Sequence, residues 1–415
     1  MKTHLRTEGI NFLINDRLVY EELPGCDPRH HGLLMNARFI QGVFDDTVDP
    51  LRFNRFGRCF DANANTEALI AALPQWYRCG LRAFTVGFQG GGPCFTIAND
   101  QICNNPFSSD GLQMAQDYLC RMAKLLNAAD ELGMVVIVSI LYGGQVRHLD
   151  GAQAVVNAIR TASAWLRQGG WKNVIVEVVN EYDSRSFRNF PLIQAPQGIV
   201  ALMDIARKES GLPVGCSGIG GTVNEEVIRA SDIVLIHGNG QSRQLLLNRI
   251  RQARSWAPEK PIVCNEDSQA VGNLQVCLDH HVSWGYYNNL TKQEPPVDWR
   301  ITEGEDQCFA FRMASALGIP YAAPQEAYQL VGYQKNECWQ GRCWPRIAAL
   351  FPETINYTDY YLDDTWLQRS YNEPFSLYYV GNWIQDPLYA EAGTLTAKIT
   401  LTSGEVLIRS GQIGQ

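Results

Sequence analysis

Residues 173–183 read NVIVEVVNEYD, and this stretch decides the fold. Apart from Glu177 the run is apolar until it stops at Asn180-Glu181. A short, nearly continuous apolar run is typical of a parallel strand that is buried on both faces. An amide and an acid stand side by side at its carboxyl end, which is where α/β barrels and open α/β sheets place their chemistry.

A second stretch repeats this arrangement further along the chain. Residues 261–267 read PIVCNED, another apolar run that ends on an acid, Glu266. Because parallel strands point the same way, Glu181 and Glu266 would open on the same end of the sheet. These two strand-end glutamates are the strongest indication of chemistry in the sequence.

Six further runs resemble these two, and a helix-like pattern follows each of the eight. Eight βα units in about 280 residues predict a (β/α)8 TIM barrel. A doubly wound open sheet is the rival, but the glycine-rich run QGGGP (89–93) follows the second strand, contains a proline and leads into a polar loop. The predicted strands are 37–44, 81–88, 134–141, 174–180, 212–217, 233–237, 262–266 and 283–287.

Both ends of the chain carry additional β structure. Residues 9–20 alternate around a turn at Asn15-Asp16, which predicts an N-terminal β-hairpin. The tail is rich in Tyr and Trp and ends in a second predicted hairpin, with its turn at Ser403-Gly404. We therefore predict a catalytic barrel with its N-terminal hairpin over residues 1–322, and a small C-terminal β appendage over residues 323–415.

Composition limits the classes of partner. The net charge of −8 argues against a general nucleic-acid binder, because phosphate binding needs a basic face. No apolar run approaches the ~20 residues of a membrane span. The N-terminal residues lack the apolar stretch of a signal peptide, which predicts a cytoplasmic protein, or a secreted one whose signal has been removed. Nothing in the sequence indicates the oligomeric state.

No metal or organic cofactor is predicted. The 12 cysteines include no C-x-x-C pair, and the sequence holds no H-E-x-x-H and no G-x-S-x-G. Free thiols are favoured over a disulfide framework, although Cys338 with Cys343, or Cys94 with Cys103, could each close a small loop.

Two carboxylates across a cleft are what cleavage of a glycosidic bond requires. One must carry a proton for the leaving oxygen, and the other must be ionised to attack the anomeric carbon or to activate water. Glu181 and Glu266 could fill these two roles. The competing interpretation is that each is a salt-bridged acid at a strand end.

The Asn180-Glu181 pair on strand four and Glu266 on strand seven resemble the clan A retaining glycoside hydrolases. Over roughly residues 37–320 the chain is similar to a distant, cellulase-like (glycoside hydrolase family 5-like) branch. The resemblance implies that Glu181 is the general acid/base and Glu266 the nucleophile, and that Asn180 bonds the sugar 2-hydroxyl. It further implies that His237 lies near the nucleophile and that Trp284 is the aromatic platform under the sugar.

The sequence departs from the family at two positions. An arginine near the end of strand two is not evident, because Arg82 begins that strand and Gln89 follows it. Tyr142 and two glycines stand where a histidine is usual at the end of strand three. These departures leave the catalytic pair in place, but they imply that substrate is bound differently from the way it is bound in the family.

Polar and aromatic side chains near the strand ends suit sugar binding. Gln89, Asn239, Asn265, Asp45 and Asp46 could hydrogen-bond hydroxyl groups, whereas Asp267 could cap the helix that follows it. Flat rings suit the apolar faces of pyranoses, although such rings also pack beneath loops. The aromatic residues at predicted strand ends are Phe44, Phe88, Tyr142, Tyr182, Trp284, Tyr286 and Tyr287.

The sequence thus predicts a retaining glycoside hydrolase that cleaves a β-glycosidic bond in an oligo- or polysaccharide by double displacement. A barrel that binds carbohydrate without cleaving it is the alternative, because a fold does not fix a function. A third possibility is a barrel enzyme that uses the two glutamates for proton transfer. The sugar, its linkage and the choice between endo and exo attack are not indicated.

Overall fold

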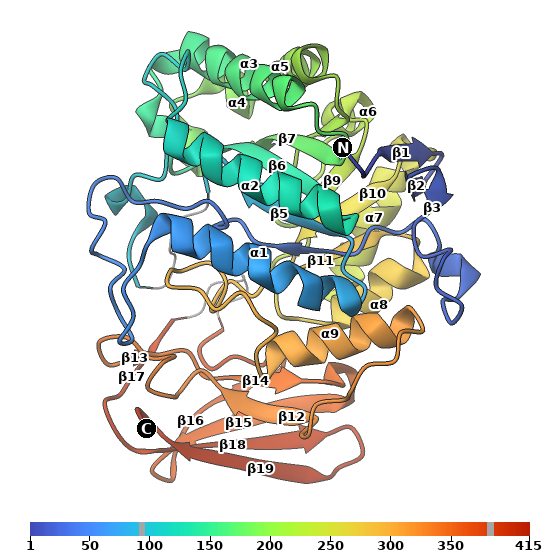
Figure 1. Ribbon diagram of the computed structural model, residues 1–415. Coiled ribbons are helices and arrows are strands. Elements are labelled where there is room, and N and C mark those ends of the chain that lie inside the picture. The colour runs from blue at the N-terminus through green and yellow to red at the C-terminus, as the bar shows by residue number, and fades with distance from the viewer. Residues whose placement is uncertain (91–95, 380–385) are drawn as a thin grey trace.

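The computed structural model describes residues 1–90, 96–379 and 386–415 of the 415-residue chain. A parallel eight-stranded sheet forms its centre, with helices packed around the outside (Figure 1). Gly91–Cys94, which belong to the glycine-rich run and to one possible disulfide pair of the sequence analysis, lie outside the described residues.

The sheet is a nearly closed barrel, which confirms the predicted fold. The strands pair in the order β8-β7-β6-β5-β4-β11-β10-β9. Two backbone hydrogen bonds, from Asp232 and Ile233 to the carbonyl of Val214, join the two ends of this order. The strands are β4 (Asn36–Arg38), β5 (Ala83–Gly87), β6 (Val135–Tyr142), β7 (Val174–Asn180), β8 (Val214–Gly215), β9 (Val234–His237), β10 (Ile262–Glu266) and β11 (Ser283–Tyr286).

The first barrel strand is shorter than predicted. We expected it over 37–44, but β4 ends at Arg38 and the chain then turns. Phe44 belongs instead to a small cluster outside the barrel, where its ring packs against Phe53 and Phe60. The apolar residues beyond Arg38 are therefore buried, as the sequence suggested, but they lie in a turn rather than in a strand.

Amphipathic helices cover the outer face of the barrel, because each has one apolar side to bury. Glycines in the left-handed conformation end α2, α3 and α5, as expected at helix C-termini. The helices are α1 (Ala62–Arg78), α2 (Gln116–Leu132), α3 (Gly151–Gly169), α4 (Pro191–Gln194), α5 (Pro196–Ser210), α6 (Glu225–Ala230), α7 (Arg243–Trp256), α8 (Gly272–Asp279) and α9 (Glu305–Ala316).

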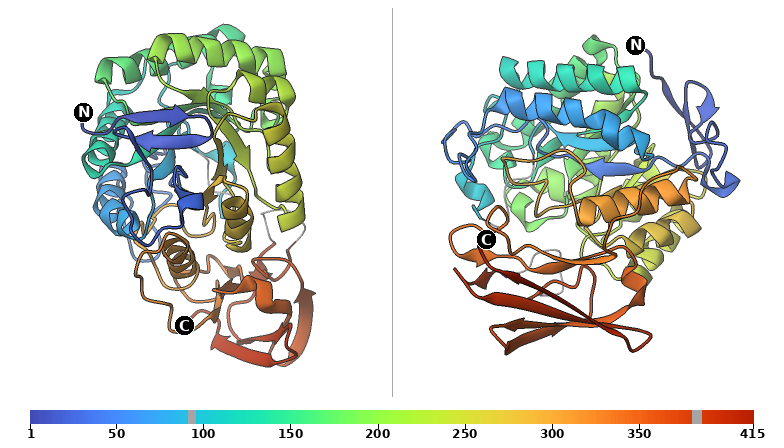
Figure 2. Two further views of the ribbon diagram at one scale, coloured as in Figure 1. Left: turned by 90° about the vertical axis from the view of Figure 1, so that its right-hand side faces the viewer. Right: turned by 60° about the horizontal axis from the view of Figure 1, so that its bottom comes forward.

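A small N-terminal sheet lies across the amino-terminal end of the barrel (Figure 2). It comprises β1 (Leu5–Glu8), β2 (Asn11–Ile14) and β3 (Arg17–Leu18), and its β2–β3 turn at Asn15-Asp16 confirms the predicted hairpin. The Tyr20 hydroxyl donates to the carbonyl of Gly80 at 2.8 Å, which ties the sheet to the barrel end opposite the strand-end glutamates.

The C-terminal residues form β sheets with a hydrophobic cluster of their own. A four-stranded antiparallel sheet runs in the order β16-β15-β18-β19, and its last two strands are the predicted hairpin. Arg346 on β14 forms a buried ion pair with Glu305 at the start of α9, at 2.6 Å. The strands are β12 (Tyr328–Val331), β13 (Arg342–Cys343), β14 (Arg346–Ala349), β15 (Ile355–Leu362), β16 (Thr365–Ser370), β17 (Leu388–Tyr389), β18 (Thr394–Leu401) and β19 (Val406–Gln412).

One disulfide, Cys338–Cys343, closes a short loop of this appendage. Nine other described cysteines are free thiols, including Cys216 and Cys264 on or beside barrel strands. Burial raises the pKa of both these thiols, so they stay protonated and behave as small apolar side chains. Among the described residues no helix is both long enough and apolar enough to cross a bilayer.

Candidate active site

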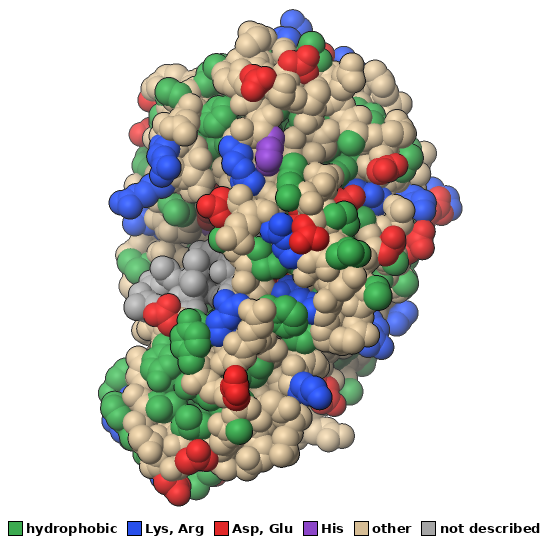
Figure 3. Space-filling model, turned by 90° about the vertical axis from the view of Figure 1, so that its left-hand side faces the viewer, with side chains coloured by type: hydrophobic (Ala, Val, Ile, Leu, Met, Phe, Trp, Pro, Cys, Tyr) green, Lys and Arg blue, Asp and Glu red, His purple; other side chains and the backbone are tan. Residues whose placement is uncertain are grey.

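Figure 3 shows the face of the molecule onto which the carboxyl ends of the barrel strands open. Hydrophobic side chains gather on its lower part, over the appendage, while charged side chains are scattered over the barrel. β7 and β10 both end at this face, so it carries the two predicted glutamates.

Glu181 directly follows β7 in a strained backbone conformation. Its φ is +53°, in the left-handed region that residues other than glycine seldom adopt. Such a conformation costs on the order of 1–3 kcal/mol and is typical of functional sites. The backbone N–H of Glu181 donates to Ser217 Oγ at 3.1 Å, and that of Tyr182 donates to the Ser217 carbonyl at 3.1 Å. The turn aims Glu181 into the mouth, where its side chain is 19% exposed.

Glu266 ends β10 and lies against a buried arginine. Arg38 Nε is 2.8 Å from Glu266 Oε2, at ion-pair distance although without the alignment of a hydrogen bond. Arg38 Nη2 donates to Asn180 Oδ1 at 2.8 Å, and Asn239 Nδ2 donates to Glu266 Oε1 at 2.7 Å. The guanidinium therefore connects Glu266 to the amide beside Glu181.

The buried guanidinium of Arg38 carries a stable positive charge. Burial opposes that charge, but the carboxylates of Glu266 and Glu177 outweigh it and raise the pKa of Arg38 above its ordinary value. A permanent cation beside Glu266 stabilises negative charge on that carboxylate.

His237 bridges the two glutamates. Its Nδ1 lies 3.0 Å from Glu181 Oε1 and 3.7 Å from Glu266 Oε2, and the ring is fully buried. Burial works against the imidazolium, but the charge of Glu266, and the hydrogen bond and charge of Glu181, more than offset it. The pKa of His237 is therefore raised above 6.5.

A third carboxylate supports His237 from inside the barrel. Glu177 Oε1 lies 3.9 Å from His237 Nε2, and Ser217 Oγ and Asn265 Nδ2 donate to it at 2.7 and 3.1 Å. The same serine thus holds both Glu177 and the backbone of Glu181. Because Glu177 is completely buried, it serves as an internal charge and not as a group that reaches the mouth.

The two glutamates lie close to each other. One oxygen of Glu181, one oxygen of Glu266 and a ring nitrogen of His237 all lie within 4.8 Å of one another. Carboxyl groups about 5–5.5 Å apart are typical of retaining glycosidases, whereas inverting enzymes hold them about 6.5–9.5 Å apart. Three such atoms could also hold a metal ion, but the Arg38 guanidinium at Glu266 would repel a cation there.

The structure places Tyr142 and Gln89 side by side near this cluster. Tyr142 ends β6 and is the register partner of Asn180 on β7. Gln89 Oε1 accepts the backbone N–H of Tyr142 at 3.0 Å, and its Nε2 donates to Asn105 Oδ1 at 2.7 Å. Gln89 is completely buried, and its side chain supports the backbone of Tyr142 at the end of β6.

Trp284 packs against the helix α9. Its ring is completely buried and lies 5.6 Å from that of Phe309 on α9. Trp284 Nε1 donates to Asp267 Oδ2 at 2.9 Å. Asp267 therefore does not cap α8, which begins after Val271, but accepts from Trp284 and from Asn273 instead. Burial raises the pKa of Asp267 to about 7.

The other strand-end aromatic residues divide between packing and the mouth. Phe88 packs against Phe107 and Trp165, so it lies beneath the outer helices. Tyr286 stacks on Phe309 and donates to Asp306 at 2.9 Å. Tyr287 is the exception, since its ring lies 5.5 Å from the guanidinium of Arg38.

Arg38, Glu177 and Ser217 complete the site and were missed in the sequence analysis. The arginine beside Glu266 comes from the first barrel strand, whereas Arg82, directly before the second, pairs with Glu22 at 3.2 Å near the N-terminal sheet. The available signal was a charged residue inside an apolar strand, as in NAR at 36–38 and VIVEVV at 174–179. Such a residue must find a buried partner, because an unpaired buried charge is very costly.

Comparison with known proteins shows similarity at the level of the fold. No protein-family model matches the sequence, and a search of curated proteins finds no match. A solved structure from Bacteroides vulgatus, named a "putative glycoside hydrolase", matches with a TM-score of 0.52 at 11% identity, covering 97% of this chain and 83% of that one. The fold is similar to that of glycoside hydrolases.

Two further solved structures match less well. The endo-β-1,4-mannanase of Thermotoga petrophila has a TM-score of 0.46 at 10% identity, over 92% of this chain and 98% of that one. A β-glucuronidase of Parabacteroides merdae has a TM-score of 0.44 at 12% identity, over 99% of this chain. This chain spans about half the length of the β-glucuronidases that it matches, namely 50% and 47% of two of them.

Proposed function

We propose that the protein is a retaining glycoside hydrolase that cleaves a β-glycosidic bond in an oligo- or polysaccharide. The observation that carries the proposal is the pair Glu181 and Glu266, which end two strands of one barrel with carboxylate oxygens within 4.8 Å. This proximity is compatible with the carboxyl separation of about 5–5.5 Å of retaining enzymes, in which one carboxylate attacks the sugar directly.

In this proposal Glu266 attacks the anomeric carbon and forms a covalent glycosyl-enzyme. The ion pair with Arg38 and the hydrogen bond from Asn239 support this role, because both stabilise the ionised carboxylate. Glu181 transfers its proton to the leaving oxygen, then removes a proton from the water that releases the sugar. His237 donates to Glu181 once that group is ionised, so the imidazole positions the acid/base without touching the sugar.

Substrate contacts are proposed for the polar and aromatic groups around this pair. Asn180, fixed by Arg38, faces the sugar 2-hydroxyl, and Tyr142 and Tyr287 border the same mouth. For Trp284 and Gln89 we propose indirect roles, through Asp267 and Tyr142 respectively.

We also retain the division of the chain into a barrel, residues 1–322, and an appendage, residues 323–415, as a proposal.

A product screen tests the proposed function. Wild type, Glu266→Gln and Glu181→Gln would be incubated with β-linked polysaccharides, oligosaccharides and aryl β-glycosides, and the products read by mass spectrometry. We expect release by wild type and loss of about 10³-fold or more in Glu266→Gln, because the nucleophile is gone. The exposed Glu259→Gln is the matched control and should match wild type.

Turnover by Glu266→Gln at the wild-type rate would contradict the proposal. Tight glycan binding by the folded wild type without product over a long incubation would favour a carbohydrate-binding barrel that does not cleave its ligand.

A further inference from the structure

A cavity of about 510 Å³ lies where the barrel mouth meets the appendage. Its walls come from the loop around Arg55 and Phe56, from Thr96, from the segment from Asn288 to Glu305, and from the appendage around the Cys338–Cys343 disulfide. Volumes of about 300–1,000 Å³ are typical of pockets that hold small molecules. Neither catalytic glutamate lines this cavity, so it is distinct from the catalytic site.

The buried charges of the cavity walls neutralise one another. Arg55 pairs with Glu294 at 3.1 Å, and the Lys292 ammonium with Asp306 at 2.8 Å. Arg346 binds both oxygens of Glu305 at 2.6 Å. These three cations already have carboxylate partners, so none of them requires an anionic ligand.

The disulfide loop contributes an aromatic side chain, Trp339, to the cavity wall. Trp339 lies within this loop and packs edge-to-face on Phe56 of the barrel, with centroids 5.4 Å apart. The Arg55 guanidinium lies 5.3 Å from the Trp339 ring centroid. Arg342, in the same loop, donates to the Thr96 carbonyl at 3.3 Å. The Phe56 ring and the Arg55 guanidinium thus hold the indole of Trp339 against the barrel. The indole remains half-buried.

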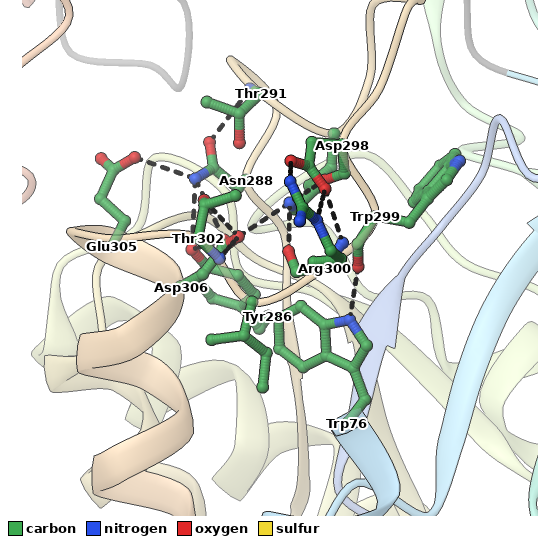
Figure 4. Close-up of polar contacts among 12 residues, drawn as sticks. Trp76, Tyr286, Asn288, Thr291, Asp298, Trp299, Arg300, Thr302, Glu305 and Asp306 are labelled. Carbon is green, nitrogen blue, oxygen red and sulfur yellow. Dashed lines mark hydrogen bonds and ion pairs between the residues drawn. The ribbon is translucent and has the colours of Figure 1, made fainter. Parts of the chain in front are cut away.

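Polar side chains also line the cavity. Thr291 lines the cavity, and its hydroxyl is buried without a hydrogen-bond partner in the described part of the chain. Figure 4 shows Asn288 beside it, with its amide directed at Glu305 and Asp306 at the start of α9. A buried hydroxyl without a partner is costly, so a ligand that bonds to it would bind more tightly.

We infer that this cavity is a sugar-binding subsite that holds a distal unit of the carbohydrate chain. The inference rests on the proposed function. A pyranose is neutral, offers an apolar face to Trp339 and supplies hydroxyl groups to Thr291. Asn288, on the cavity wall, directly follows Tyr287, whose ring faces the Arg38 that contacts Glu266. Two consecutive residues after β11, Tyr287 and Asn288, therefore link the catalytic site to the cavity.

Calorimetric titration of the full chain tests this subsite. Glu266→Gln would be titrated with β-1,4-linked hexasaccharides of glucose, mannose and xylose, alone and combined with Trp339→Ala, Trp339→Phe or Thr291→Val. We expect Trp339→Ala to weaken the tightest hexasaccharide about tenfold or more, and Trp339→Phe and Thr291→Val to weaken it less. Trp366→Ala is the control, because Trp366 is 56% exposed on β16, away from the cavity, and should change nothing.

Wild-type turnover distinguishes a subsite from a structural role. With the catalytic glutamate intact, Trp339→Ala should raise KM for the hexasaccharide and leave kcat/KM for an aryl β-glycoside unchanged, since that substrate does not reach the cavity. Equal losses on both substrates would overturn the inference, as would hexasaccharide affinities in Trp339→Ala that equal those in Trp366→Ala. The absence of any hexasaccharide binding to Glu266→Gln would also overturn the inference. The proposed function would remain in place, because it depends only on product release by wild type.

Discussion

Replacement of Arg38 by methionine tests whether the buried ion pair holds the site together. Arg38 and Glu266 have side chains only 1% and 7% exposed and lie 2.8 Å apart. Methionine fills similar space without charge, so Arg38→Met leaves the buried Glu266 with the hydrogen bond from Asn239 but without its ion-pair partner. Asn180 Oδ1 loses its donor at the same time.

The expected loss of stability follows from the distance and the burial. At 2.8 Å and an effective dielectric constant of about 20, two unit charges attract by roughly 6 kcal/mol, part of which offsets their desolvation. Removal of one member of such a pair leaves an uncompensated charge and costs about 3–5 kcal/mol of the free energy of unfolding. An exposed pair at similar distance contributes about 0–1 kcal/mol.

Urea denaturation of the full chain, followed by circular dichroism, measures this loss. Arg6→Met is the matched control, because Arg6 and Asp16 lie 2.6 Å apart with side chains 56% and 69% exposed. The double variant Arg38→Met/Glu266→Gln should recover part of the stability, since neither charge remains. The reasoning is refuted if Arg38→Met costs no more than Arg6→Met, or if the double variant shows no coupling.

Two further predictions concern titrating groups. The pKa of Asp267, about 7, lies above its unfolded value, so the stability it contributes is complete below pH 4 and disappears as pH rises through 7. Asp267→Asn should abolish this decline, on the order of 4 kcal/mol, in denaturation curves between pH 4 and 8, and an unchanged slope would contradict it. The imidazole of His237 should titrate above 6.5 by NMR in wild type, and at lower pH in Glu181→Gln, where the charge of the carboxylate is lost. A wild-type value below 6.5 would show that burial outweighs the carboxylates.

The barrel strands and their terminal glutamates could be predicted because buried parallel strands are nearly continuous apolar runs. Glu181 and Glu266 interrupt such runs at their carboxyl ends, and the direction of the strands then brings them to one face. The N-terminal and C-terminal hairpins were equally readable, because their turn residues and alternation are local signals.

Because these apolar runs are nearly continuous, the sequence does not show which side chains face the barrel interior. In strands buried on both faces, hydrophobicity does not alternate, so the position of Trp284 on SWGY does not show whether its ring faces the mouth or a helix. Arg38 was overlooked for a related reason. An arginine in an apolar strand signals a buried partner, but the sequence does not show that this partner is Glu266, far away along the chain.

The appendage illustrates a third limit. Its strands follow from alternation, but its docking depends on non-local contacts such as Trp339 on Phe56 and Arg346 on Glu305. The two residues of each pair are far apart in the sequence, and no local pattern indicates that they meet. The cavity between the barrel and the appendage could therefore not be anticipated.

The most direct test of the proposed chemistry is to trap the covalent intermediate. Wild type would be treated with the activated 2-deoxy-2-fluoro derivative of the sugar that the product screen identifies, then digested and analysed by peptide mass spectrometry. We predict a single added glycosyl group on Glu266, with none in Glu266→Gln and normal trapping in Glu259→Gln. Product release with inverted anomeric configuration, or a glycosyl group on another residue, would contradict Glu266 as the nucleophile of a retaining enzyme.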